Sequence, residues 1–285
     1  MVRLTKFFAL FPLMLLGACA TAKIEAAFIP KAEALPGWSA HSPTSTATIN
    51  HDAWDAFLKK YVETDRTGLN RLAYAAVTSE DDRNLRAYIK ALESLVITTY
   101  TRDEQFAYWA NLYNALTVRT ILDHYPVSSI RKIGGGGPLS TGPWNQKITT
   151  VEGRDLSLHD IESRIMRPIW NDPRIHYAVN CAAIGCPNLR MMAFRGATLD
   201  ADLDTQARAY INDPRGVAVS DDRLKVSSIY AWYAEDFGNT DAAIIAHLML
   251  FADDELKQQL DEFSSINSYA YDWGLNDVVR GQTGS

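Results

Sequence analysis

The sequence predicts an α+β fold, in which one mostly helical domain carries a small antiparallel sheet. Long segments place apolar residues at helical spacing, and these segments follow one another in groups. The few segments with strand-like alternation are short, and two of them flank a tight turn as in a hairpin. Grouped helices with a few antiparallel strands are typical of the α+β class. With 285 residues, the chain is long enough for one large domain with its own core.

The N-terminal residues have the pattern of an export signal. Arg3 and Lys6 precede a short apolar run, which is followed by Leu-Gly-Ala-Cys ending at Cys19. The run has about ten residues, whereas a membrane-spanning helix needs roughly 20. The ending resembles a bacterial lipobox, which implies that the signal peptide 1–18 is removed and that Cys19 is lipidated. An ordinary signal peptide is the alternative. The resemblance implies an exported lipoprotein that faces the periplasm, and Ala20 favours the outer membrane.

Residues 19–47 are rich in Ala, Ser, Thr and Pro, so we expect a lipidated cysteine and a flexible tether before a domain at 48–280. Removal of residues 1–18 leaves 26 basic and 34 acidic residues, a net charge of −8. Nucleic acid is excluded as a partner, because phosphate binding needs clustered Lys and Arg. The expected partners are the membrane, through Cys19, and a peptide or amide substrate.

Three helices are predicted in the first half of the domain. Asn50 is a good N-cap for the first, the second starts after Ser79, and the third starts at Thr101. Thr101 and Glu104 have the spacing of a capping box. The glycine run at 134–137 predicts a loop, since no P-loop lysine follows it.

The second half mixes short strands and helices. Strands are predicted at 147–151 and 175–180, and a hairpin at 217–227 turns at Asp221 and Asp222. A short helix is predicted to be capped by Ser157. The other segments with helical spacing are 198–211, 229–237, 241–251 and 254–263.

Glu162 is the first candidate for a functional side chain. It lies four residues after Leu158, on the inward apolar stripe of the helix that Ser157 caps. A carboxylate at such a position needs a partner, because its desolvation costs several kcal/mol. The partner is either Arg167 or Arg174 in a structural ion pair, or a histidine that Glu162 orients.

The segment around the cysteines supplies the next candidates. In the predicted strand, His176 and Asn180 share the polar face, whereas Cys181 falls on the core face. Cys186 follows a glycine bend and precedes a proline, which fits a helix start. There the helix dipole would lower the pKa of the thiol. Cys186 is therefore preferred to Cys181 as a nucleophile beside His176.

Two asparagines of the third helix complete the set of candidates. Asn111 and Asn114 are three residues apart on one side of the helix, beside Trp109. Together with Asn180 and Trp109, they could bind the peptide group of a substrate. The alternative, which is favoured for Asn111 and Asn114, is that they tie the helix to a neighbouring loop.

Four ordered motifs resemble those of the domain of unknown function 547 family. They are AYWANLYNAL (107–116), LSLHDIE (156–162), DPRIHYAVNCAAIGCPNL (172–189) and YDWGLN (271–276). The resemblance implies an α+β fold with features of a cysteine-peptidase core. It also implies a catalytic set of Glu162, His176 and either Cys186 or Cys181. Gly185 replaces the usual serine before the second cysteine of the motif.

Two function hypotheses follow. In the first, a thiol-dependent hydrolase or acyl transferase acts on a peptide or amide bond. Cys186 attacks, His176 carries the proton, Glu162 orients the imidazole, and Asn180 or backbone N–H groups stabilise the oxyanion.

In the second hypothesis, the chain is a non-catalytic envelope domain for binding or scaffolding. Cys181 and Cys186 then form a disulfide in an oxidising compartment. A metal site built from these cysteines and His176 would lack a clear fourth ligand. We therefore expect neither a metal nor another cofactor.

Overall fold

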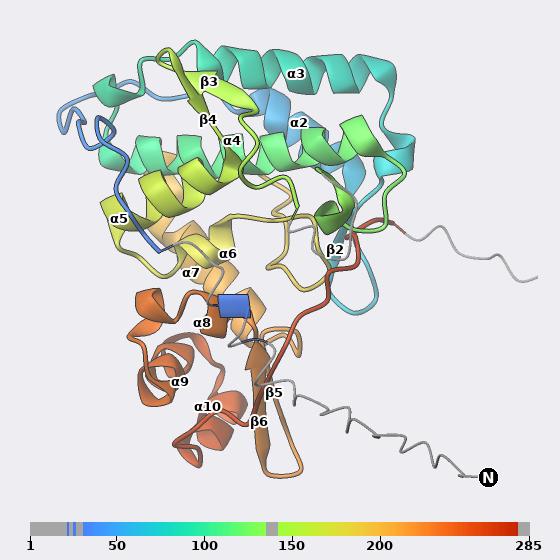
Figure 1. The fold of residues 1–285 in the computed structure, drawn as a ribbon, viewed down its shortest axis with the longest axis vertical. Helices are drawn as coiled ribbons and strands as arrows, with labels where there is room; N and C mark the ends of the chain where they lie inside the picture. Colours follow the sequence, from blue (N-terminus) through green and yellow to red (C-terminus); the bar gives the residue numbers. More distant parts are fainter. Residues whose placement is uncertain (1–21, 23–24, 27–30, 135–141, 279–285) are drawn as a thin grey trace, which may run out of the picture.

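A computed structural model describes residues 22, 25–26, 31–134 and 142–278 (Figure 1). Helices dominate this part of the chain and the sheets are small, which confirms the predicted α+β class. Cys19 and most of the predicted glycine loop lie outside the described residues. Among the helices that the structure does describe, none combines the length and the apolar character needed to cross a bilayer.

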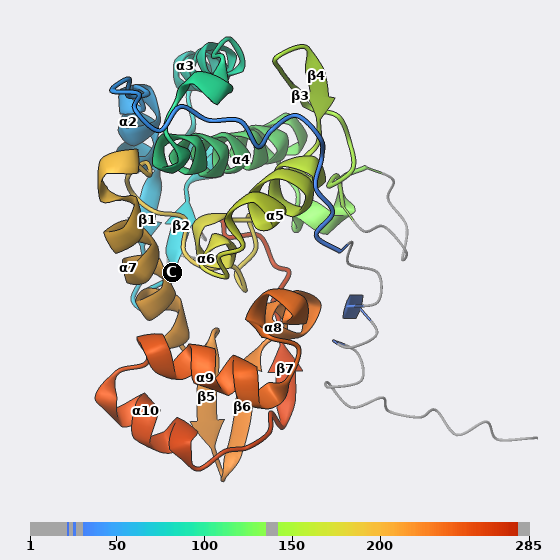
Figure 2. The same ribbon diagram turned by 90° about the vertical axis from the view of Figure 1, so that its left-hand side faces the viewer.

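Three helices form one end of the molecule: α2 (Asp52–Tyr61), α3 (Ser79–Glu93) and α4 (Arg102–His124) (Figures 1 and 2). The Thr101 side chain caps α4 by accepting a hydrogen bond from the Glu104 N–H, as predicted. The carboxylate of Glu104 accepts a hydrogen bond from the Ile49 N–H, which ties the chain before α2 to α4.

Two short hairpins and a bent helix lie around this helical end. The hairpins pair β1 (Val62–Thr64) with β2 (Asn70–Leu72), and β3 (Thr149–Val151) with β4 (Arg154–Leu156). Ser157 caps the next helix, as predicted, since its hydroxyl accepts a hydrogen bond from the Asp160 N–H. This helix has a π-helical segment, η4 (Asp160–Met166), and continues as α5 (Arg167–Trp170).

The other end of the molecule packs a three-stranded sheet against helices (Figure 2). The helix α7 (Leu199–Ile211) connects the two ends. The elements of the second end, in chain order, are β5 (Val217–Ser220), β6 (Arg223–Ser227), α8 (Ile229–Trp232), η6 (Ala234–Phe237), α9 (Asp241–Phe251), α10 (Asp254–Asp261) and β7 (Ser268–Ala270). The predicted hairpin turn is present, with Asp221 and Asp222 at φ 50° and 55°. One detail differs from the expected antiparallel sheet, because β7 pairs with β6 in parallel.

The core has two parts. The first core cluster consists of buried apolar residues between 38 and 203 together with Leu275. The second core cluster consists of Ala22, Tyr177 and buried apolar residues between 207 and 269. The helix α6 (Ile175–Ala178) lies where the two clusters meet, because Ile175 belongs to the first and Tyr177 to the second.

The predicted strand at 175–180 is therefore wrong, because residues Ile175–Ala178 form a single helical turn. Pro173 precedes the turn, and Asp172 accepts a hydrogen bond from the Arg174 N–H, as at a capped helix start. Alternation over six residues identifies a strand only when one face is exposed, and here Ile175 to Asn180 are all buried. His176 and Asn180 accordingly do not share a strand face.

Residues 31–47, expected as part of a flexible tether, pack in part against the domain. Trp38 is buried and meets Trp109 edge to face, with 5.2 Å between ring centroids. The Leu35 N–H donates a hydrogen bond to the Arg164 carbonyl. The packed unit thus starts before residue 48, because an indole buries too much apolar surface to stay in solvent.

Two buried histidines predict a pH dependence of stability. Burial lowers the pKa of both His51 and His247 to about 4. Unfolding returns each pKa to about 6.5, so the unfolded state binds more protons as the pH falls below that value. We expect each histidine to cost about 2 kcal/mol of stability between pH 7 and pH 5. Urea unfolding at pH 7 and pH 5 measures this loss. In the His51→Gln variant, the loss of stability that the two histidines cause should be about half as large. An unchanged loss would show that His51 does not contribute to the pH dependence.

Candidate functional site: an aromatic pocket with a disulfide in its wall

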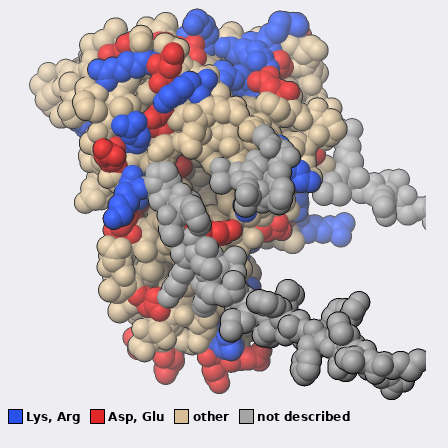
Figure 3. Space-filling model, in the orientation of Figure 1, with Lys and Arg blue, Asp and Glu red and all other residues tan. Residues whose placement is uncertain are grey.

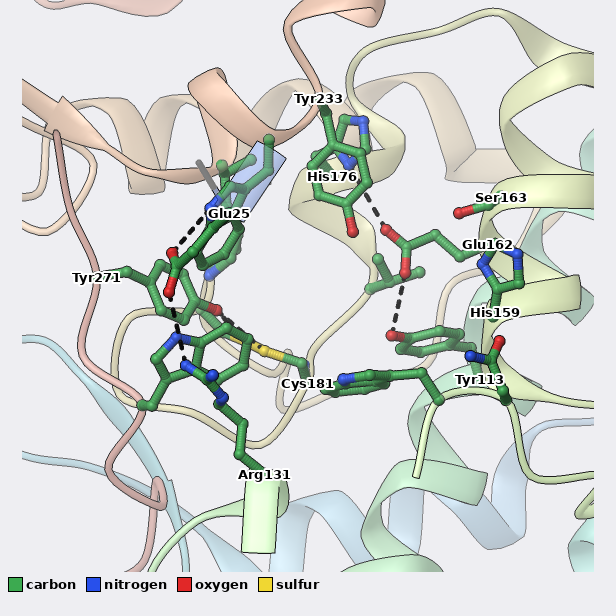
Figure 4. A pocket seen from close by; sticks show the side chains of 18 residues that line it. Glu25, Tyr113, Arg131, His159, Glu162, Ser163, His176, Cys181, Tyr233 and Tyr271 are labelled. Carbon is green, nitrogen blue, oxygen red and sulfur yellow. Dashed lines mark hydrogen bonds and ion pairs between the residues drawn. A yellow bond between two sulfur atoms is a disulfide. The ribbon is translucent and has the colours of Figure 1, made fainter. Parts of the chain in front are cut away.

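A cavity of about 290 Å³ opens between the two core clusters (Figure 4). Six of its 18 lining residues are aromatic: Tyr113, Trp144, Trp232, Tyr233, Tyr271 and Trp273. Its acidic, arginine and histidine side chains are Glu25, Arg131, His159, Glu162 and His176. Both cysteines of the central motif also line it. Segments far apart in the sequence thus contribute to one site.

Cys181 and Cys186 are joined by a disulfide. The hydroxyl of Tyr271 lies 3.0 Å from each sulfur, so the bridge is held against the aromatic wall. Two expectations about these residues are wrong. Cys186 does not start a helix, because 187–190 is irregular chain, and Cys181 does not face away from the site, because both sulfurs line the pocket.

Glu162 and His176 meet in the pocket, so a histidine is a partner of Glu162, which is one of the two alternatives that the sequence left open. The Nδ1 atom of His176 lies 3.7 Å from Oε1 of Glu162. Tyr113 donates a hydrogen bond of 3.1 Å to Glu162, and Figure 4 shows the carboxylate between these two partners. The ring of Tyr233 stacks on the imidazole of His176 at 4.1 Å, which holds it in place.

Asp236 is the closest carboxylate to His176 and was not predicted. Its Oδ2 lies 2.6 Å from His176 Nε2 and 2.6 Å from Arg167 Nε. Burial alone would raise the pKa of Asp236, but the hydrogen bonds from His176 and Arg167 outweigh burial and lower it. Arg167 is thus an ion-pair partner of Asp236, whereas Arg174 pairs with Asp172, Asp200 and Asp204.

The tyrosines around this cluster stay protonated at neutral pH. Burial raises the pKa of Tyr113, Tyr233 and Tyr271 well above its ordinary value, and the negative charge of Glu162 adds to the effect. Their hydroxyl groups are therefore hydrogen-bond donors toward Glu162 and toward the sulfurs.

The side chains predicted to bind a substrate instead form hydrogen bonds or core contacts within the protein. Asn111 exchanges two hydrogen bonds with the backbone of Phe194, which supports the favoured structural role. Asn114 bonds the Ala178 carbonyl and the Asn180 N–H.

Asn180 and Trp109 also make structural contacts. The Asn180 side chain bonds the Pro187 carbonyl and the Ala182 N–H. Trp109 is buried in the first core cluster, and neither it nor the three asparagines is among the residues that line the pocket. Their contacts lend no support to substrate binding.

Sequence patterns offered no signal for three other pocket residues. Glu25, Arg131 and Trp232 lie in separate segments, and only the fold brings them together. Within the described ranges, no group of three or more His, Cys, Asp or Glu side chains is arranged to hold a metal ion.

The fold and the site define a class of protein: an α+β domain with an aromatic, ligand-sized pocket whose wall contains a disulfide. Residues 97–211 match the model of the family described as "Protein of unknown function, DUF547". The match supports the family resemblance for a segment that includes Glu162, His176 and both cysteines. No curated protein and no solved structure matches the chain.

Proposed function

We propose that the chain is an exported lipoprotein, held at the membrane through Cys19, whose domain binds a ligand in the aromatic pocket without using its cysteines as nucleophiles. The observation that carries the proposal is the disulfide between Cys181 and Cys186 in the pocket wall. A disulfide persists in an oxidising compartment such as the periplasm, and it leaves neither sulfur as a thiolate.

The surroundings of His176 support the same reading. Carboxylates face both of its ring nitrogens, Glu162 at 3.7 Å and Asp236 at 2.6 Å. A Cys–His pair needs one imidazole nitrogen within hydrogen-bond reach of the sulfur. To reach a sulfur, the imidazole of His176 would have to break its contact with Glu162 or Asp236. Its stacking on the ring of Tyr233 opposes such a movement.

The wall of the pocket suits binding of a ligand that is partly apolar. Aromatic rings provide large contact surfaces at low cost in conformational entropy, and a few polar groups fix the orientation of a ligand. Glu162 lies on one side of the cavity, and Glu25, Arg131 and the disulfide lie on the other (Figure 4). This division favours an amphipathic ligand such as a peptide segment.

Thiol counting tests the proposal. A chain carrying Cys19→Ser should show no free thiol in denaturant without reductant and two after reduction. Cys186→Ser in the same background should expose one thiol, that of Cys181. The proposal fails if the unreduced chain shows two thiols, and also if iodoacetamide labels Cys186 rapidly at pH 7 in a reaction that His176→Ala abolishes.

A thiol-dependent hydrolase or acyl transferase is the second candidate. It is favoured by one observation, namely that both sulfurs, His176 and Glu162 line the same cavity. A dithiol reductant would have to break the disulfide first. The freed Cys186 thiolate would then attack an amide carbonyl and expel the amine, leaving an acyl-enzyme for water to hydrolyse. The labelling experiment above separates the two candidates.

A further inference from the structure

The carboxylate of Glu25 lies in the pocket although its chain segment precedes the domain. The indole Nε1–H of Trp232 donates a hydrogen bond of 3.2 Å to Glu25 Oε2, and Arg131 Nη1 lies 3.7 Å from Glu25 Oε1. Figure 4 shows Glu25 on the opposite side of the cavity from Glu162. The contacts join residues more than 100 positions apart, so they arise from the fold.

The donors that hold Glu25 belong to a packed aromatic platform. Trp232 stacks on Trp273, with 5.3 Å between centroids and 26° between planes, and Tyr271 lies 4.7 Å from each of these rings. The guanidinium of Arg131 lies over Trp273 at 5.1 Å. An N–H and a guanidinium fixed at the edge of stacked rings form a preorganised receptor for one carboxylate.

The described residues next to Glu25 are Ala22 and Ala26. Ala22 is buried in the second core cluster and Ala26 packs against that cluster. The side chains of Glu25 and Arg131 remain 36% and 37% exposed, and ion pairs of that exposure contribute about 0–1 kcal/mol. A ligand with the same chemistry and more contacts in the pocket can therefore displace Glu25.

We propose that Arg131, Trp232 and Trp273 form a subsite for the side-chain carboxylate of an acidic peptide, and that Glu25 is its built-in occupant. The inference rests on the proposed function, since it names the ligand class for the same pocket. The ligand carboxylate takes the position of Glu25, and the flanking peptide lies along the aromatic wall. Because Glu25 is tethered, it competes at a high effective concentration and lowers the apparent affinity for the ligand.

Peptide titration of the full chain tests this inference. The probe is the acetylated and amidated peptide AKIEAAF, copied from 22–28, so that its single carboxylate is the glutamate side chain. Binding is followed by calorimetry and by tryptophan fluorescence. Glu25→Gln should bind the probe about tenfold more tightly than the unmodified chain, because the internal competitor is removed. Glu33→Gln, at an exposed position of the same N-terminal region, should match the unmodified chain.

Two further arms test the carboxylate contact. The peptide with glutamine in place of glutamate should bind Glu25→Gln about tenfold more weakly, and Arg131→Gln in the Glu25→Gln background should weaken the original probe similarly. Equal affinity of the unmodified and Glu25→Gln chains overturns the inference, as does equal affinity of the two peptides or no binding at all. The proposed function fails on a different result, two thiols in the unreduced chain, so the two failures are distinguishable.

Discussion

Replacing Arg167 by methionine is expected to lower the free energy of unfolding by about 3 kcal/mol. The guanidinium of Arg167 is only 2% exposed and forms ion pairs with Asp236 at 2.6 Å and Glu235 at 2.5 Å. Its removal leaves the partly buried carboxylate of Asp236 beside His176 without its cationic partner. Urea unfolding at pH 7 measures the loss.

An exposed arginine provides the matched control for Arg167. Arg86 also pairs with two carboxylates, Asp82 and Asp123, but its side chain is 42% exposed. Arg86→Met should change the free energy of unfolding by less than about 1 kcal/mol, because solvent screens such pairs. Equal losses for the two variants would show that the buried network around His176 contributes no special stability.

Replacing Trp109 by alanine is expected to cost about 3–5 kcal/mol of stability, the range for a large aromatic side chain removed from a core. The indole is 1% exposed and meets the rings of Trp38 and Tyr108 edge to face, at 5.2 and 4.8 Å. Its loss opens a cavity in the first core cluster, which thermal or urea unfolding detects.

Trp144 is the matched control for Trp109, because it is a partly buried tryptophan in the pocket wall. Trp144→Ala should cost much less stability and should weaken binding of the AKIEAAF probe instead. If Trp109→Ala kept full stability but lost ligand binding, the structural role of Trp109 would be wrong and the substrate-binding prediction would gain support.

Structural features that depend on a few neighbouring residues could be predicted from the sequence. Apolar spacing located α2, α3 and α4, and the side chains of Thr101 and Ser157 marked two helix starts, because a cap bonds N–H groups only a few residues away. The turn at Asp221 and Asp222 was equally local. Errors arose where burial erased the pattern, as in Ile175–Ala178, where a helical turn enclosed by two core clusters alternates like a strand.

Some residues of the pocket could be predicted from the sequence, and others could not. A carboxylate on an apolar stripe signals a buried partner, so the sequence indicated that Glu162 has one but left open whether it is an arginine or His176. Asp236 gave no such signal, because it lies 60 residues after His176 in a segment of ordinary polarity. The sequence also did not predict that Glu25 and Arg131 line the pocket, because each has the sequence context of a charged residue on the solvated surface.

The sequence by itself determined the fold class, the helix starts at Thr101 and Ser157, the choice of Glu162 and His176 as candidates, and the alternatives for the two cysteines. Only the tertiary structure decided that those cysteines bond to each other, that Asp236 takes the second nitrogen of His176 and that Glu25 enters the pocket. The physical reason is the separation along the chain of the residues that interact. Caps, turns and periodicity act over a few residues, whereas an ion pair or a stacked ring depends on which distant segments the packing of two cores brings together.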